Sequence, residues 1–248
     1  MNNIAIIIPS RLNAKRLPNK PLKLISDKEM ILHVQDTALK ANVGEVYVAT
    51  PDQKIFDLIK KGGGNSVLTS NKHETGTDRI YEVFEKKLNS KPDLIINFQG
   101  DMPNLNPSAI KNLVEHMKKN LCDIGTLASK LNIKNEEKDS NVVKVLVNKN
   151  LENNSFSRAV DFFRISNNPL SELTYHYIGI YAFTKEALLR YVGLKRSKKE
   201  LDRKLEQLRA LENDMKIDVG FISEPPLSVD SEEDLKNIKK IMEKNVKN

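Results

Sequence analysis

Ile4-Ala5-Ile6-Ile7-Ile8-Pro9 is an unbroken apolar run near the start of the chain, and the basic stretch from Ser10 to Leu22 follows it directly. A continuous apolar run of this length predicts a strand of a parallel sheet that is buried on both faces. Ligands of open α/β sheets bind beyond the carboxyl ends of the strands. The residues after Pro9 are therefore the first place to expect a site.

Short apolar runs then alternate with helical patterns, which is the order of a parallel α/β sheet. Strands are predicted at 45–49, 66–68 and 93–98, and helices at 30–41, 53–61, 77–88 and from Asn106-Pro107 onward. After residue 135 the pattern changes, with strands predicted at 142–147, 177–183 and 218–222 and helices at 200–212 and 231–244. We predict one α/β domain over 1–248. It has a mostly parallel, doubly wound sheet with helices on both faces and a small antiparallel insertion at about 135–200.

Composition narrows the class of protein. The chain has 248 residues, 39% of them hydrophobic, and no apolar run approaches the roughly 18–20 residues of a membrane helix. A single cysteine, Cys122, excludes an internal disulfide and a multi-cysteine metal site, and the N-terminus lacks a secretory pattern. His33 and His116 lie on helical patterns without metal-ligand spacing. A cytoplasmic protein without a membrane partner is expected.

The net charge of +7 raises the question of nucleic-acid binding. Lysines account for 31 of the 40 basic residues, the chain has no tryptophan, and aromatic residues make up 6%, so platforms for base stacking are scarce. We therefore expect no nucleic-acid partner. The nine arginines are few enough that each is a candidate for a defined role.

The loop after Pro9 carries four cations, Arg11, Lys15, Arg16 and Lys20, which could clamp a polyanion such as a triphosphate. A solvated basic turn is the competing interpretation. The loop is not a Walker loop, and Gly62-Gly63-Gly64 precedes a strand, so a dinucleotide-binding glycine pattern is also absent.

The loop resembles the Pro-x-Arg-x-x-Ser-x-Arg-Leu-Pro-x-Lys-x-Leu motif of the nucleotidyltransferases that activate acidic sugars with CTP. Five further blocks follow in that family's order, so the resemblance runs from Ile4 to Leu235. They are Asn97–Pro103 with its Gln-Gly-Asp, His73–Arg79, Tyr175–Tyr181, Leu205–Arg209 and Val229–Leu235.

The resemblance implies Mg²⁺-dependent transfer of CMP from CTP to 3-deoxy-D-manno-octulosonate (KDO), which releases pyrophosphate and serves lipopolysaccharide biosynthesis. It also implies a homodimer formed through the insertion. Two alternatives stay open: a cytidylyltransferase for an amino-substituted KDO or another 2-keto acidic sugar, and a non-catalytic nucleotide- or RNA-binding protein. RNA binding would need the cations but not two metal-binding carboxylates.

On the nucleotide side, the resemblance assigns roles by position. The triphosphate is assigned to Arg11, Arg16 and Lys20, and Mg²⁺ to Asp101 and Asp230, with Arg11, Lys20 and the two aspartates counted as catalytic. The nucleotide pocket is assigned to Thr75, Gly76, Thr77, Arg79 and Gln99. The structural alternatives are a turn for Asp101, a helix-terminus charge for Asp230, a helix N-cap for Thr77 and a turn-tying amide for Gln99.

On the sugar side, the resemblance assigns KDO binding to Arg158, His176, Glu206 and Gln207. The alternatives are a surface arginine, a core histidine, and a Glu206 that pairs with Arg203 and Arg209 along a helix. The sequence departs from the family at Ala14, Asn19, Met102, Val160–Phe163 and Arg203. The departures leave the charged residues of the nucleotide and metal half intact, whereas the sugar half follows the family pattern less closely.

Overall fold

The computed structural model describes residues 3–13, 16–119, 122–152 and 155–246, and its internal contacts divide the chain into two compact units. Unit 1 comprises 1–111 and 226–248, and unit 2 comprises 112–225. Lys15 and Ala14 of the basic loop lie outside the described residues. Among the described residues, no helix combines the length and apolar character that crossing a membrane requires.

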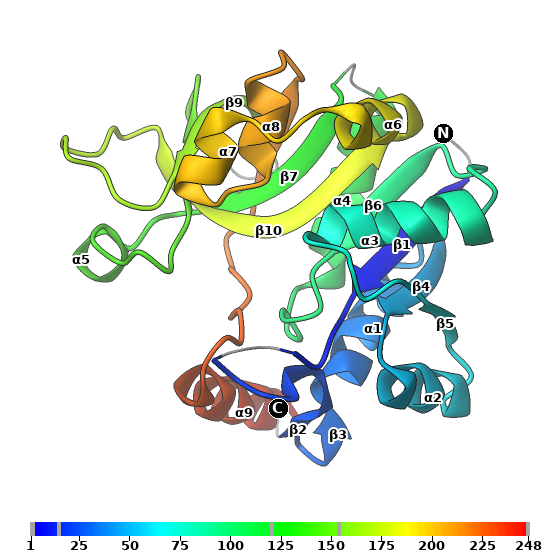
Figure 1. Ribbon diagram of the computed structural model, residues 1–248. Helices are drawn as coiled ribbons and strands as arrows, with labels where there is room; N and C mark the ends of the chain where they lie inside the picture. The colour runs from blue at the N-terminus through cyan, green and yellow to red at the C-terminus, as the bar shows by residue number, and fades with distance from the viewer. Residues whose placement is uncertain (1–2, 14–15, 120–121, 153–154, 247–248) are drawn as a thin grey trace. The chain divides into compact units, whose positions relative to one another are not determined.

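Unit 1 contains a parallel sheet with the strand order β5-β4-β1-β6 (Figure 1). The strands are β1 (Ile4–Pro9), β4 (Glu45–Thr50), β5 (Asn65–Leu68) and β6 (Leu94–Phe98). Every residue of β1 is buried, because β1 lies between β4 and β6 and has apolar side chains on both faces. The predicted first strand and the predicted parallel arrangement of this half are confirmed.

The helices of unit 1 follow the predicted spacing closely. They are α1 (Met30–Ala41), α2 (Gln53–Lys61), α3 (Gly76–Glu82), which continues as a π-helical turn η2 (Val83–Lys87), and the long α4 (Pro107–Lys119), which extends into unit 2. Asn106 accepts a hydrogen bond from the backbone N–H of Ser108 (3.0 Å), so the predicted Asn-Pro helix start is confirmed.

A short hairpin and the C-terminal helix complete unit 1. The hairpin pairs β2 (Leu24–Ile25) with β3 (Lys28–Glu29) through Ser26 and Asp27, which both have positive φ, as a two-residue hairpin turn requires. The helix is α9 (Glu232–Val246), and Ser231 caps it by exchanging hydrogen bonds with Asp234. One apolar cluster joins these parts, formed by Leu17, Ile25, Met30, Val229, Leu235 and Ile238.

Unit 2 is built on five strands that close on one another in the order β10-β7-β11-β9-β8, with a further pairing of β8 to β10. They are β7 (Ile124–Ser129), β8 (Lys144–Val147), β9 (Phe156–Phe163), β10 (Thr174–Thr184) and β11 (Ile217–Phe221). All pairs are antiparallel except β7–β11. This closed arrangement is not the doubly wound sheet that we predicted, although the fold as a whole is mixed α/β.

The remaining helices of unit 2 are short. They are α5 (Ile133–Glu136), α6 (Lys185–Gly193), α7 (Lys198–Arg203) and α8 (Gln207–Leu211). The single helix predicted over 200–212 is wrong, because Lys204 adopts a left-handed conformation (φ 55°, ψ 47°) that ends α7. Glu206 therefore precedes α8, and Gln207 begins it.

Candidate active site

Two anchors bring distant parts of the chain together beside the basic loop. Leu17 is fully buried and packs with Val229 and Leu235, so the second half of the loop is held against the start of α9. The backbone N–H of Val229 also donates to the carbonyl of Asp101 (2.9 Å). These contacts place Asp230, Asp101 and the loop in one region of unit 1.

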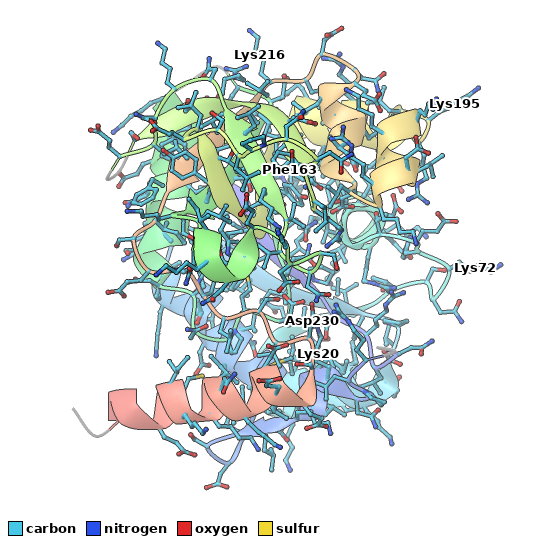
Figure 2. All side chains as sticks on the ribbon, turned by 90° about the vertical axis from the view of Figure 1, so that its left-hand side faces the viewer. Lys20, Lys72, Phe163, Lys195, Lys216 and Asp230 are labelled. Atoms are coloured by element: carbon cyan, nitrogen blue, oxygen red, sulfur yellow. The ribbon has the colours of Figure 1, made fainter. Side chains whose placement is uncertain are left out.

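At this meeting point one ammonium group bridges two carboxylates. Lys20 Nζ lies 3.0 Å from Asp101 Oδ2 and 2.9 Å from Asp230 Oδ1. Arg16 donates to the other oxygen of Asp230 (2.9 Å). Figure 2 shows Lys20 and Asp230 next to each other, beside the first turn of the C-terminal helix. The four residues, which the family resemblance assigns to the triphosphate and to Mg²⁺, thus lie together in the structure.

The bridge changes the proton affinity of its members. Burial alone would lower the pKa of Lys20, but the charges of Asp101 and Asp230 outweigh it, so the pKa of Lys20 is raised. Burial alone would raise the pKa of Asp230, yet the charges of Lys20 and Arg16 hold it below its ordinary value. Both partners are therefore charged at neutral pH.

A cavity of about 480 Å³ opens beside this cluster, a size that suits a small-molecule ligand. Seven of its lining residues were predicted from the sequence: Arg11, Lys20, Thr75, Gly76, Arg79, Gln99 and Asp101. It is also lined by Ser10, Asn13, His73, Glu74 and Gly100, together with two prolines, Pro9 and Pro21. The cationic and amide groups on its wall fit an anionic, hydrogen-bonding ligand such as a nucleotide.

The N-terminus of α3 forms one wall of the cavity. Thr75 is the N-cap and forms a capping box with Asp78, so the alternative of Thr77 as the N-cap is wrong. Thr77 is fully buried, accepts a hydrogen bond from Asn97 (3.1 Å), and is not among the cavity-lining residues. A Cβ at Gly76 would lie 3.3 Å from Gln99 Nε2, so glycine gives the closest fit between this turn and Gln99.

Arg79 and Gln99 are both fixed by neighbours. Arg79 donates to Thr69 Oγ1 (2.5 Å) and to the carbonyl of Ser70 (2.9 Å). Gln99 donates to Asn97 Oδ1 (3.1 Å) while it lines the cavity, so it ties down its turn and also faces the ligand space. Burial and the nearby Arg11 lower the pKa of Arg79 from its usual high value.

Sequence reasoning did not assign four polar residues of the cavity: Ser10, Asn13, His73 and Glu74. His73 Nε2 lies 2.5 Å from Glu82 Oε2, which fixes the imidazole at the edge of the cavity. Ser10 Oγ is buried and has no hydrogen-bond partner among the described residues. Two sequence features indicate Ser10 and His73. Ser10 follows the first predicted strand directly, and His73 begins the family-like block His73–Arg79.

Unit 2 distributes the four predicted sugar-binding residues over separate contacts. Arg158 Nε lies 2.8 Å from Asp218 Oδ1, an ion pair without hydrogen-bond geometry. His176 pairs with Glu136 (3.1 Å), so it is neither a core residue nor unpartnered. Gln207 Oε1 accepts a hydrogen bond from the Tyr181 hydroxyl (3.1 Å), and its amide nitrogen has no partner among the described residues.

Arg203 and Arg209, the two arginines considered as helical partners of Glu206, each contact another carboxylate. Arg203 donates to Asp161, and Arg209 forms a bidentate pair with the fully buried Glu200. The backbone carbonyl of Glu206 accepts a hydrogen bond from the Tyr191 hydroxyl (2.9 Å). Arg158, His176 and Gln207 each contact a different residue, and the contacts described within unit 2 give them no partner in common.

The donor set around Lys20 fits a magnesium ion. Two carboxylates already approach one cationic atom within 3.0 Å, so the ammonium occupies the kind of position that a cation between them would take. Mg²⁺ prefers hard oxygen ligands and is commonly held by one or two carboxylates together with substrate phosphates. Asp101 and Asp230 meet that description.

Comparisons with known proteins show which family the chain resembles. The cytidylyltransferase family matches residues 5–217. The 3-deoxy-manno-octulosonate cytidylyltransferase of Bartonella henselae is 40% identical over 96% of this chain and 97% of its own. That of Brucella ovis is 40% identical over 92% and 91%.

A solved structure of a CMP:2-keto-3-deoxy-manno-octonic acid synthetase complexed with CTP has a TM-score of 0.88 and 32% identity, covering 98% of this chain and 99% of that one. The identity and the coverage exceed what a shared fold alone would produce. The chain belongs to the cytidylyltransferase family that includes the 3-deoxy-manno-octulosonate cytidylyltransferases.

Proposed function

We propose that this enzyme transfers CMP from CTP to KDO, giving CMP-KDO and pyrophosphate for lipopolysaccharide biosynthesis. The observation that carries the proposal is the bridge of Lys20 between Asp101 and Asp230 beside a cavity lined by Arg11 and Arg79. An RNA-binding protein would need the cations but not the two carboxylates. The named relatives act on KDO, so an amino-substituted sugar is not favoured.

In the proposed reaction, the anomeric hydroxyl of KDO attacks the α-phosphorus of CTP, and the bond from that phosphorus to the bridging oxygen of pyrophosphate breaks. Catalysis of such a transfer rests largely on positioning and on neutralising charge. Arg11, Arg16 and Lys20 would bind the triphosphate and stabilise the charge that builds up on pyrophosphate. Thr75, Gly76, Arg79 and Gln99 would hold the nucleoside portion, with Thr77 supporting that wall from within.

Asp101 and Asp230 would hold Mg²⁺. When bound, the ion would polarise the phosphate and favour loss of the hydroxyl proton. The raised pKa of Lys20 keeps its ammonium protonated, so it can balance either the carboxylates or the triphosphate.

For the acidic sugar, Arg158, His176, Glu206 and Gln207 remain the proposed ligands. Support is strongest for Gln207. Its buried amide nitrogen has no hydrogen-bond partner among the described residues and could donate to the sugar. Arg158 would bind the KDO carboxylate only with the part of its guanidinium that Asp218 leaves available. A homodimer through the region around 135–200 also remains a proposal, based on the family resemblance. A doubly wound arrangement of the nucleotide-binding unit remains a proposal based on the order of strands and helices in the sequence, and a cytoplasmic location remains one based on composition.

The test measures pyrophosphate release with CTP, KDO and Mg²⁺, with UTP or ATP in place of CTP and an amino-substituted KDO as a second acceptor. We expect CTP and KDO to be the productive pair and to yield CMP-KDO. Failure of the folded protein to turn over KDO, with turnover of the amino-substituted sugar, would overturn the choice of acceptor.

The same assay tests the metal assignment. Asp101→Asn should abolish turnover without unfolding the protein, because the ammonium and the metal lose a shared ligand. Asp57→Asn is the matched control, because Asp57 is an exposed carboxylate on α2 outside the cavity, and it should retain activity. Near-normal activity of Asp101→Asn would remove the metal role of this residue.

A further inference from the structure

A second group of potential metal ligands lies in unit 2 and includes none of the residues assigned to the candidate active site. His116 is in the last turn of α4, Cys122 precedes β7, and Asp218 lies on β11. Their ligand atoms lie within 4.8 Å of one another. His116 Nε2 is 2.9 Å from Asp218 Oδ2. All three side chains are largely shielded from solvent, with Cys122 only 5% exposed.

The packing of the sheet accounts for this convergence. Asp218 is paired with Gly125 across β11 and β7, and a Cβ at Gly125 would lie 2.7 Å from Met117 Sδ. Glycine at this point therefore lets α4 approach the sheet closely and brings His116 over Asp218. A Cβ at Gly220, two residues along the same strand, would lie 2.5 Å from the Phe156 ring.

The donor atoms are held in place by their neighbours. Phe156 stacks on the imidazole of His116 with ring centroids 3.6 Å apart and an interplanar angle of 4°. Arg158 Nε lies 2.8 Å from Asp218 Oδ1, which leaves Oδ2 on the side of His116. Cys122 Sγ is 3.4 Å from Met117 Sδ. Neighbours that fix ligand orientation in this way are a common feature of protein metal sites.

We propose that His116 Nε2, Cys122 Sγ and Asp218 Oδ2 form a site for a divalent transition-metal ion, with zinc as the ion that best matches the ligands. Zinc takes imidazole, thiolate and carboxylate in tetrahedral sites, whereas magnesium avoids sulfur. Coordination would replace the thiol proton and any proton on His116 Nε2, and both would leave to solvent. Asp218 Oδ1 would keep its ion pair with Arg158. As metal ligands, the site uses none of the residues proposed for the KDO reaction, although its Asp218 pairs with one of them, Arg158.

Cobalt titration of the full-length, chelator-treated protein gives the sharpest test. Cys122 is the chain's only cysteine, so a thiolate-to-cobalt charge-transfer band can arise from this site alone. We expect the band to saturate near one equivalent of Co²⁺ and to disappear when Zn²⁺ displaces the cobalt. Absence of the band in the folded protein under excess Co²⁺ would overturn the proposal and leave a purely structural ion-pair cluster.

Variants separate this site from the carboxylate pair of unit 1. Cys122→Ser should remove the band, and His116→Gln should weaken Co²⁺ binding by about tenfold or more. Asp101→Asn should leave the band unchanged while turnover is lost, so failure of one proposal does not imply failure of the other. A band that survives in full in folded His116→Gln would contradict the proposed ligand set.

Discussion

At the scale of single residues, Lys20 is the side chain on which the candidate site depends. Its ammonium neutralises two carboxylates from distant parts of the chain, and it also lines the cavity. Arg16 also contacts Asp230, so these two cations together balance the charge of the two carboxylates. An incoming triphosphate and cation would compete for these same partners.

Lys20→Met should lower kcat by about 10²–10³-fold, the usual effect of removing one charge-stabilising donor. It should also raise the KM for CTP, because the triphosphate loses a cationic partner. Steady-state pyrophosphate release measures both. Lys23→Met is the matched control, since Lys23 pairs with Glu232 and does not line the cavity. Equal activity of the two variants would contradict the role of Lys20.

The charged residues of the site were predictable because the resemblance assigns them by position in short blocks. Lys20, Asp101 and Asp230 come together as expected, whereas Ser10 and His73 were not identified as cavity residues. Position in a motif does not reveal which neighbouring side chains face the same space. The roles of Arg158 and His176 depend on tertiary partners, Asp218 and Glu136, which no local pattern indicates.

At the scale of elements, α3 is stabilised by a carboxylate that organises the loop before it. Glu82 accepts hydrogen bonds from the Ser70 backbone N–H (2.8 Å) and Lys86 (3.2 Å), and contacts His73. Burial alone would raise the pKa of Glu82, but these hydrogen bonds outweigh it and lower the pKa to about 2.

Glu82→Gln should therefore reduce the free energy of unfolding at neutral pH by up to about 3 kcal/mol. Because the folded-state pKa is depressed, this contribution is complete above the ordinary glutamate pKa and is lost as the pH falls toward about 2. Urea unfolding of both proteins between pH 7 and pH 2 measures the difference. Glu115→Gln, at an exposed position on α4, is the control. A stability difference that persists undiminished at pH 2 would exclude this linkage.

The break between α7 and α8 gives a second prediction. Lys204 is exposed and has φ 55°, a conformation that glycine adopts without a steric cost. Lys204→Gly should stabilise the protein by about 1 kcal/mol, measured by urea unfolding. Lys236→Gly, within α9, should instead destabilise it by about 1 kcal/mol. If both substitutions destabilise the protein, residue 204 does not adopt the left-handed conformation in the folded protein, and the prediction is wrong.

Prediction of elements succeeded where the pattern was strong. The helices α1 and α2 have the bounds expected from apolar spacing, and β1 is the expected continuous run. The prediction of a single helix over 200–212 is wrong. The leucine stripe continues across Lys204, but the spacing of apolar residues does not reveal the left-handed backbone conformation of that residue. The strands β7 and β9 were missed, and the burial of β9 depends on partners in β8 and β11.

At the scale of the whole molecule, the chain has a mixed α/β fold whose first unit was foreseen and whose second was foreseen only in part. The parallel order of β5, β4, β1 and β6 follows from alternating strands and helices. The ring closure of β8 onto β10 could not be predicted, because pairing between strands distant in sequence leaves no local signal. The match to a solved CTP-bound synthetase, with a TM-score of 0.88, extends over nearly the full chain.

The central claim is that Asp101 and Asp230 jointly hold the cation that accompanies the nucleotide. A crystal structure of the protein grown with CTP and Mn²⁺ tests it most directly through the anomalous signal of the metal. We predict a Mn²⁺ peak coordinated by both carboxylates and by phosphate oxygens, with Lys20 bound to the triphosphate. A Mn²⁺ peak held by the triphosphate alone, with Lys20 still bridging Asp101 and Asp230, would contradict the account.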